Sequence, residues 1–279
     1  MKCLNLGCGA RFHPQWTNLD LTPSGQNVRA YDCRQPLPFE DESFDVVYHS
    51  HLIEHLRRED VIRFLRECCR VLRPGGILRV AIPDLEGIAR DYLECLEKAL
   101  EGKAGSEHDY NWMMLELFDQ TVRDRSGGAM LEYLRRDPIP NEQFVLRRWG
   151  GEARRIISQP GPAGKQTKPL ASVSRRGRSG VSGLLRSLRH AIARMFLTEK
   201  ELQALELGQF RLQGEMHQWM YDRYSLKRLL EAAGFQNPTQ RTALESAVPN
   251  WPDYHLDTEP DGSVYKPDSL YMEAARPVS

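Results

Sequence analysis

The first third of the chain alternates short apolar runs with turns and a helical pattern, and this alternation limits the fold more than any other feature. Residues 59–72 place apolar side chains at the i, i+3, i+4 and i+7 spacing of an amphipathic helix. Strand-like runs occupy residues 3–6, 16–21, 27–31, 43–49 and 77–82. Strands that alternate with helices favour a mostly parallel sheet covered on both faces. We therefore predict an α/β fold with a doubly wound, mostly parallel sheet.

Glycines, acids and histidines follow the predicted strands. Gly7 and Gly9 come directly after the first strand, Asp20 ends the second, and Asp32 follows the third. Three histidines lie within residues 49–55, at the end of the fourth strand. Because ligands of such sheets bind beyond the carboxyl ends of the strands, we expect these groups at one site.

The glycine turn is compatible with only some ligands. A dinucleotide fingerprint has a third glycine where this chain has Phe12, and no Gly-Lys-Ser/Thr follows to form a P-loop. The missing side chains of Gly7 and Gly9 would let a ligand approach the backbone closely. The carboxylate of Asp20 is suited to accept hydrogen bonds from a ribose diol. An isolated Gly-x-Gly is more often a tight turn without a ligand, and these residues alone leave that alternative open.

The order of several motifs resembles a known family. The chain is similar to class I S-adenosylmethionine-dependent methyltransferases of the type 11 methyltransferase domain branch in LNLGCG at 4–9, Asp20, LPFEDESFDVV at 37–47, Glu54-His55 and VLRPGG at 71–76. The match covers residues 1 to about 92 and resumes at residues 224–235, a predicted helix with Ser225 as N-cap and Gly234 as C′ residue. Residues 269–274 would be the final strand. The resemblance implies a seven-stranded, Rossmann-like sheet.

The resemblance also implies S-adenosyl-L-methionine as the cofactor and suggests roles by position. Asp20 would hold the ribose hydroxyls, and Asp32 would lie near the adenine amino group. The remaining cofactor contacts would come from the first turn and from the end of the fourth strand: Asn5, Gly7, Cys8, Gly9, His49 and Ser50.

The chain departs from the family pattern in three places. Asn5 replaces the usual acid, so its amide oxygen would accept a hydrogen bond from the cofactor's ammonium without a charge. Arg11 replaces the third glycine of the usual run. Asp20 follows Gly9 by only eleven positions, too few for the helix of a normal parallel crossover. We expect that helix to be reduced to a turn or lost.

Methyl transfer mainly requires alignment of a nucleophile with the methyl group, with a base where the nucleophile is a hydroxyl. The candidates for this base are His49, His51, Glu54 and His55, and His51 is the first choice because it lies nearest the strand end. The alternative is that Glu54 and His55 only brace the next helix. A metal site would need converging ligands, and His51 and His55 are the only pair at helical spacing, so we predict no metal.

The pattern divides the chain into three segments. Residues 1–95 and 218–279 would form the methyltransferase core, and residues 96–217 a helical lid inserted between them. Aromatic and methionine side chains in residues 110–133 and 217–221 would either line an acceptor pocket or form the lid's own core.

Charge is unevenly distributed, although the 38 basic and 38 acidic residues cancel. Residues 147–194 contain twelve basic residues and one acid. Within them, residues 158–183 are rich in Gly, Ser and Pro and poor in large apolar residues, so we predict a flexible basic loop. Residues 184–196 carry an apolar stripe beside basic residues, typical of a helix on an anionic membrane or of one packed on the lid. Nucleic-acid binding is disfavoured because interleaved aromatics are missing.

The sequence favours a cytoplasmic enzyme. It shows no signal peptide, spanning segment or CxxC pair, so we predict a cytoplasmic protein, or one held peripherally at the inner face of a membrane. The sequence of residues 219–225 is similar to the same segment in family members whose genes lie beside those of surface-polysaccharide enzymes. We predict an S-adenosylmethionine-dependent methyltransferase acting at a hydroxyl of a small-molecule or saccharide acceptor, free or lipid-linked. The alternative is a cofactor-binding, non-catalytic partner in a glycan-assembly complex.

Overall fold

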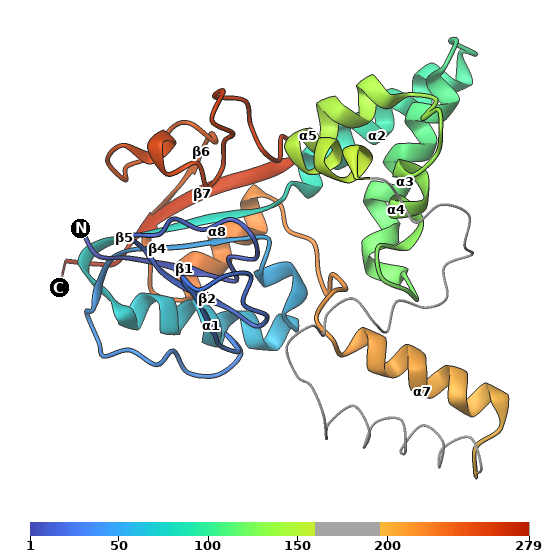
Figure 1. Ribbon diagram of the computed structural model, residues 1–279. Coiled ribbons are helices and arrows are strands. Elements are labelled where there is room, and N and C mark those ends of the chain that lie inside the picture. Colours follow the sequence, from blue (N-terminus) through green and yellow to red (C-terminus); the bar gives the residue numbers. More distant parts are fainter. Residues whose placement is uncertain (160–195, 279) are drawn as a thin grey trace.

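The computed structural model describes residues 1–159 and 196–278 and has a seven-stranded sheet at its centre (Figure 1). The strand order is β3-β2-β1-β4-β5-β7-β6, and β7 runs antiparallel to both neighbours while the other adjacent pairs are parallel. The mostly parallel sheet is therefore confirmed. Its strands are β1 (Cys3–Leu6), β2 (Thr17–Asp20), β3 (Val28–Ala30), β4 (Phe44–Ser50), β5 (Leu72–Pro83), β6 (Gln236–Arg241) and β7 (Ser269–Ala275).

The helices fall into two groups. Two of them, α1 (Arg58–Val71) and α8 (Arg223–Ala232), pack on the sheet, and the short turns η1 (Ile53–His55) and η2 (Trp251–Tyr254) lie in connections. The others form a helical lobe beyond the ends of β5 and β7, with α7 extending away from it (Figure 1). These are α2 (Leu85–Leu100), α3 (Ser106–Val122), α4 (Gly128–Leu134), α5 (Glu142–Ser158) and α7 (Glu199–Arg211).

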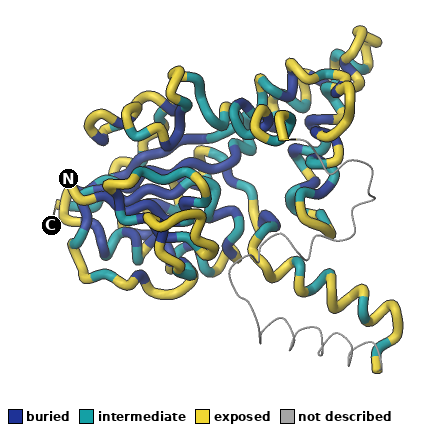
Figure 2. The backbone as a smooth tube through the Cα atoms, in the orientation of Figure 1, coloured by how far each residue is buried: buried dark blue, intermediate teal, exposed yellow. Residues whose placement is uncertain are grey.

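The first face of the sheet is covered by α1 and α8. The predicted stripe of α1 is buried as expected, and Phe64 and Leu65 pack with Leu226 and Leu230 of α8 against the strands. Burying each such side chain contributes about 1.5–3 kcal/mol. Figure 2 shows this burial along the central strands, whereas α7 has no buried residue.

The N-terminus of α8 differs from the prediction. Asp222 is the N-cap, and Ser225 stands three residues later as the reciprocal partner in a capping box. The prediction of Ser225 as N-cap was wrong because Asp222, an equally good capping residue, lies one turn earlier. Gly234 has φ +100° directly after the C-cap, as predicted for a C′ glycine.

The second face of the sheet is covered by the chain between β6 and β7. In the described residues no helix lies between Gly9 and Asp20, so the crossover helix is lost as expected. Residues 242–268, here called the covering segment, take its place. Their Trp251 packs against Trp16 and Tyr48 with ring centroids 6.0 and 5.1 Å apart.

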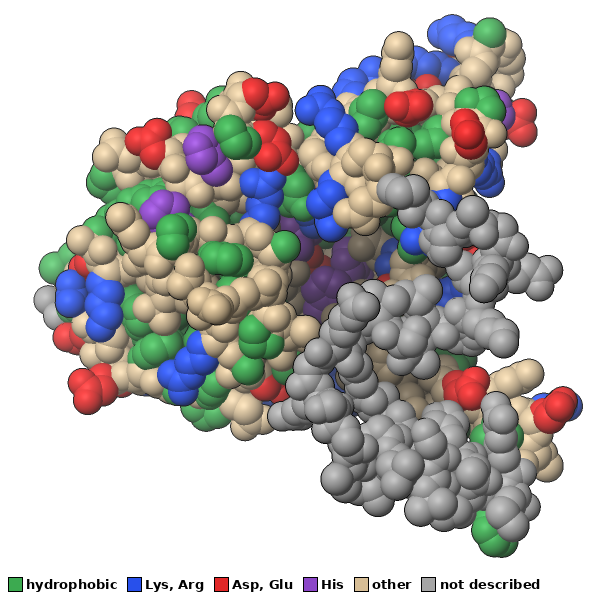
Figure 3. All heavy atoms as spheres, viewed as in Figure 1, with side chains coloured by type: hydrophobic (Ala, Val, Ile, Leu, Met, Phe, Trp, Pro, Cys, Tyr) green, Lys and Arg blue, Asp and Glu red, His purple; other side chains and the backbone are tan. Residues whose placement is uncertain are grey.

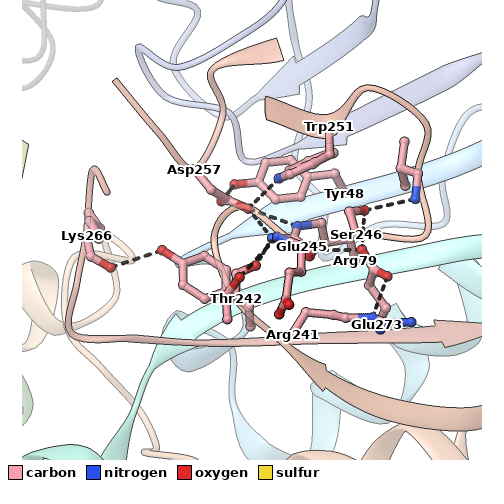
Figure 4. A network of polar contacts seen from close by, with 12 residues as sticks. Tyr48, Arg79, Arg241, Thr242, Glu245, Ser246, Trp251, Asp257, Lys266 and Glu273 are labelled. Atoms are coloured by element: carbon pink, nitrogen blue, oxygen red, sulfur yellow. Dashed lines mark hydrogen bonds and ion pairs between the residues drawn. The ribbon is translucent and has the colours of Figure 1, made fainter. Parts of the chain in front are cut away.

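A buried charge network anchors the covering segment to the sheet (Figure 4). Arg79 on β5 is fully buried and pairs with Asp257 and Glu273, each at 2.8 Å. Its guanidinium also donates to the carbonyl of Thr242 at 2.8 Å, and Tyr48 donates its hydroxyl to Asp257 at 2.5 Å. A buried guanidinium is tolerated only when its charge and its donors are satisfied in this way.

The helical lobe has a hydrophobic core of its own. Trp112, Met113 and Tyr133 are buried there, so these aromatic and methionine residues form the lobe's interior and do not line an acceptor pocket. Trp112 donates its indole N–H to Glu116, which also pairs with Arg148 at 2.6 Å. Apart from residues 158, 159 and 196, the predicted basic loop 158–183 and helix 184–196 lie outside the described residues.

Candidate functional site

The turn after β1 has the backbone geometry that requires glycine. Gly7 has φ +63° and Gly9 has φ +53°, a region that other residues rarely adopt. A Cβ added at Gly7 would lie 2.9 Å from the side chain of Leu52, whereas one added at Gly9 would meet no atom within 4 Å. Gly7 is therefore needed for packing, and Gly9 faces open space that a ligand can enter.

Asp20 at the end of β2 braces this turn. One carboxylate oxygen accepts from the Gly9 N–H at 2.8 Å, and the other accepts from the Thr22 N–H at 2.7 Å. Each carboxylate oxygen can accept a second hydrogen bond, so a diol could bind without displacing either backbone contact. Asp32 instead forms a bidentate pair with Arg34, at 2.8 and 2.7 Å, and this hydrogen bonding lowers the pKa of the Asp32 carboxyl.

Asn5 and Arg11 form hydrogen bonds that hold the glycine turn in place. The Asn5 amide donates to the Arg11 carbonyl at 3.1 Å, and its Oδ1 is buried with no hydrogen-bond partner in the described part of the chain. The Arg11 guanidinium donates to the carbonyls of His255 and Thr258 at 2.8 and 3.0 Å. The residue that replaces the family's glycine thus ties the turn to the covering segment. Cys8 is buried, and burial raises the pKa of its thiol to about 12.

His49 and Ser50, the last two residues of β4, have different environments. His49 is fully buried on β4, where its ring meets the edge of Phe64 at 5.3 Å and burial lowers its pKa to about 3. Both ring nitrogens lack partners among residues 1–159 and 196–278. The His49 ring thus packs against α1, and its predicted roles as a base and in cofactor binding stay predictions. Ser50 is half-buried at the end of β4, in register with Ala81.

A cavity of about 350 Å³ lies between the sheet and the helical lobe. Figure 3 shows histidine side chains in this hollow, between the two lobes. The ends of β4 and β5 supply His51, His55 and Pro83 to its wall, and the helical lobe supplies apolar groups such as Met130 and Trp149. Its ionisable lining residues come from widely separated segments: His51, His55, Arg123, Glu152, Glu215, His217, Lys266 and Asp268.

Two of the predicted catalytic residues, His51 and His55, line this cavity, and a third, Glu54, is buried beside them. His51 has φ +49°, and its Nε2 lies 2.9 Å from the Ser269 hydroxyl while its Nδ1 lies 3.2 Å from Glu54 Oε1. Burial lowers the pKa of His51 well below its usual range, and burial raises the pKa of Glu54. His55 places its Nδ1 3.2 Å from the Met216 carbonyl.

Several cavity residues were missed by the sequence interpretation. His217 follows α7 by six residues and is buried against His55, with ring centroids 4.7 Å apart. His217 belongs to residues 217–221, which were considered only for their aromatic and methionine side chains. Lys266 pairs with Glu152 of the helical lobe at 2.8 Å, and burial raises the pKa of nearby Asp268 to about 7. No local motif marks Lys266 or Asp268.

Comparison with known proteins supports the interpretation of the glycine turn. Residues 4–80 match the family described as Methyltransferase domain. A Mycobacterium tuberculosis protein named "Probable S-adenosylmethionine-dependent methyltransferase" is 52% identical over 48 residues, 17% of each chain. A phthiotriol/phenolphthiotriol dimycocerosates methyltransferase of the same organism is 43% identical over 80 residues, covering 23% of this chain and 28% of its own. The chain thus spans less than a third of the length of these curated relatives.

Solved structures also align with the chain, at low sequence identity. A Pyrococcus horikoshii protein aligns with 23% identity over 33% of this chain and 54% of its own, at a TM-score of 0.28. The family match covers β1 to most of β5, which includes the glycine turn, Asp20 and the segment from His49 to His55. The printed name of the first of these relatives gives S-adenosylmethionine as its cofactor. Residues 4–80 are therefore similar to a methyltransferase domain.

Proposed function

We propose that this protein transfers the methyl group of S-adenosylmethionine to a hydroxyl of a small-molecule or saccharide acceptor. The observation that carries the proposal is the position of the glycine turn and the imidazole-lined cavity, both beyond the carboxyl ends of the parallel strands. When bound, the cofactor supplies an electrophilic methyl group on a sulfonium. The open space at Gly9 and the unpartnered Oδ1 of Asn5 fit such a ligand, because its ammonium group can donate to that oxygen.

His51 is the proposed base. It lies at the boundary between the strand ends and the cavity, and Glu54 lies on its Nδ1 side. A proton on Nδ1 would leave Nε2 as the acceptor, at the position where it now meets the Ser269 hydroxyl. An acceptor hydroxyl that replaces this contact would give up its proton to Nε2 as its oxygen attacks the methyl group. A positioned base of this kind contributes about 10²–10⁴-fold in rate.

The acceptor class is proposed from the cavity lining and from the relatives. Arg123, Lys266 and Asp268 offer hydrogen-bonding groups for a polar acceptor, and Met130 and Trp149 offer apolar surface beside them. A relative whose printed name is a phthiotriol dimycocerosates methyltransferase supports an acceptor with a lipid portion. We therefore favour a hydroxyl on a molecule with both polar and apolar parts, such as a lipid-linked saccharide.

Contact with a membrane surface is a further part of the proposal. Within residues 1–159 and 196–278, no helix combines the length and the apolar character needed to cross a membrane. The basic composition of residues 147–194 and the apolar stripe of 184–196 support reversible attachment to an anionic surface, at about 1 kcal/mol for each nearby basic residue. Co-sedimentation with anionic vesicles at low salt should retain the full chain and lose a variant that lacks residues 158–196. Equal sedimentation of the two proteins would contradict the proposed contact with a membrane surface.

Calorimetry followed by turnover tests the function. S-adenosylhomocysteine should give a saturable isotherm with the full chain, and NADH should give none; the opposite result would overturn the proposal. Turnover is then measured with radiolabelled S-adenosylmethionine and panels of hydroxylated glycans and glycolipids. Labelled product that depends on His51 supports the enzyme. Cofactor binding without turnover on any acceptor would favour the non-catalytic partner of a glycan-assembly complex.

A further inference from the structure

A group of potential metal ligands converges at the wall of the cavity. Glu54, His55 and His217 each direct one ligand atom to a common point, and these atoms all lie within 4.8 Å of one another. Glu54 and His55 are neighbours in the short turn η1, whereas His217 lies about 160 residues later in the chain. The expectation that no metal binds considered only residues 49–55, and the fold brings in a ligand from outside them.

Two of these groups have buried polar atoms without a hydrogen-bond partner in the described part of the chain. Glu54 is 0% exposed, and neither carboxylate oxygen forms a hydrogen bond within the described chain; His51 approaches one of them only at ion-pair distance. His217 is 5% exposed, and its Nδ1 has no hydrogen-bond partner in the same residues. Buried polar atoms are normally satisfied, and exceptions call for an unseen water, ion or functional role.

The surroundings hold these ligands in place. The Nδ1 of His55 meets the Met216 carbonyl at 3.2 Å, which leaves Nε2 available, the arrangement that fixes metal-binding histidines in many proteins. The backbone N–H of Gln218 donates to the Glu54 carbonyl at 2.6 Å, and that of His217 donates to Gln120 at 3.0 Å. The two segments that carry the ligands are thus joined directly by their backbones.

We propose that Glu54, His55 and His217 bind a divalent transition-metal ion, with zinc the best match to two imidazoles and one carboxylate. In a tetrahedral site with bonds of 2.0–2.2 Å, ligand atoms lie about 3.4 Å apart, so side-chain rotation has to bring these atoms closer than their present separations of up to 4.8 Å. Three protein ligands leave one coordination position open. Because His55 and His217 line the cavity, this position faces it.

Metal binding does not depend on the proposed methyl transfer and is tested without cofactor. The full chain, prepared without a histidine tag and stripped with a chelator, is titrated with Zn²⁺ by calorimetry and with Co²⁺ by visible absorption. We expect one ion per chain and the intense absorption of tetrahedral Co²⁺. H217A and E54Q should each weaken binding by at least about 100-fold, whereas H108A, at an exposed histidine on α3, should bind as wild type does.

The controls separate loss of a ligand from loss of the fold. Circular dichroism and thermal melting of the stripped proteins establish that each variant is folded, and E54Q keeps the shape of the side chain it replaces. Absence of Zn²⁺ and Co²⁺ binding by the wild-type chain would overturn the proposal. Binding that survives in both H217A and E54Q, or that is lost equally in H108A, would also overturn it. A positive result with no S-adenosylhomocysteine binding would leave the metal site standing and reject the methyltransferase.

Discussion

Replacement of Asp20 by alanine should weaken cofactor binding by an amount that the turn geometry allows us to work out. The change removes the carboxylate that accepts from the Gly9 and Thr22 N–H groups at 2.8 and 2.7 Å. It also removes the acceptor proposed for the ribose hydroxyls. A hydrogen bond to a charged group contributes about 1.5–3 kcal/mol, which at about 1.4 kcal/mol per tenfold corresponds to a loss of about 10- to 150-fold in affinity.

Calorimetry with S-adenosylhomocysteine measures this loss without turnover. Asp20→Asn keeps one acceptor oxygen and should lose less affinity than Asp20→Ala. Asp253→Ala, at an exposed acid in η2, is the matched control and should bind normally. Urea unfolding without ligand reports any damage to the turn itself. If folded Asp20→Ala binds as tightly as wild type, the carboxylate only braces the turn and the ribose assignment is refuted.

Three further predictions concern stability, pH and catalysis. Arg79→Leu leaves Asp257 and Glu273 buried without their partner and should lower the free energy of unfolding by about 3–5 kcal/mol in urea; a loss below 1 kcal/mol would contradict the buried network. The raised pKa of Asp268, about 7 in the folded chain, means that the folded state holds its proton longer than the unfolded state does. The wild type should therefore lose stability as pH rises from about 4 through 7, and Asp268→Asn should show a smaller loss in urea unfolding between pH 5 and pH 8; parallel curves would reject this origin. His51→Gln should lower kcat by about 10²–10⁴-fold with S-adenosylhomocysteine affinity unchanged, and an unchanged kcat would exclude His51 as the base.

Six of the seven described strands, all but β6, could be located from the sequence because their signals are local. Apolar runs ended by Gly7, Asp20 or Pro83 correspond to β1, β2 and β5, and the stripe of α1 is buried as its spacing requires. The same reasoning failed at the start of α8, where two good capping residues compete and the choice depends on tertiary contacts. The covering segment could not be predicted, because a loop has no periodic pattern of apolar residues. Its burial depends on the ion pair between Asp257 and Arg79.

The cofactor side of the site was more predictable than the acceptor side. The glycine turn and Asp20 lie within a few residues of strand ends, so strand topology alone brings them together. His217 reaches Glu54 only because the chain after α7 returns to η1 and forms backbone hydrogen bonds there. His49 shows that closeness to a strand end in the sequence is not sufficient. Its ring packs against Phe64 of α1.

The loss of the first crossover helix explains why the rest of the site is built as it is. Without that helix the second face of the sheet needs another cover, and the covering segment supplies it through Trp251 and the pairing of Asp257 with Arg79. The same segment continues to Lys266, whose carbonyl accepts from the Tyr271 hydroxyl at 3.0 Å and whose ammonium reaches the helical lobe at Glu152. The structure that compensates for the missing helix therefore also forms part of the cavity wall. It follows that damage to the buried network should change both acceptor binding and cofactor binding, since Arg11 ties the glycine turn to the same segment through the carbonyls of His255 and Thr258.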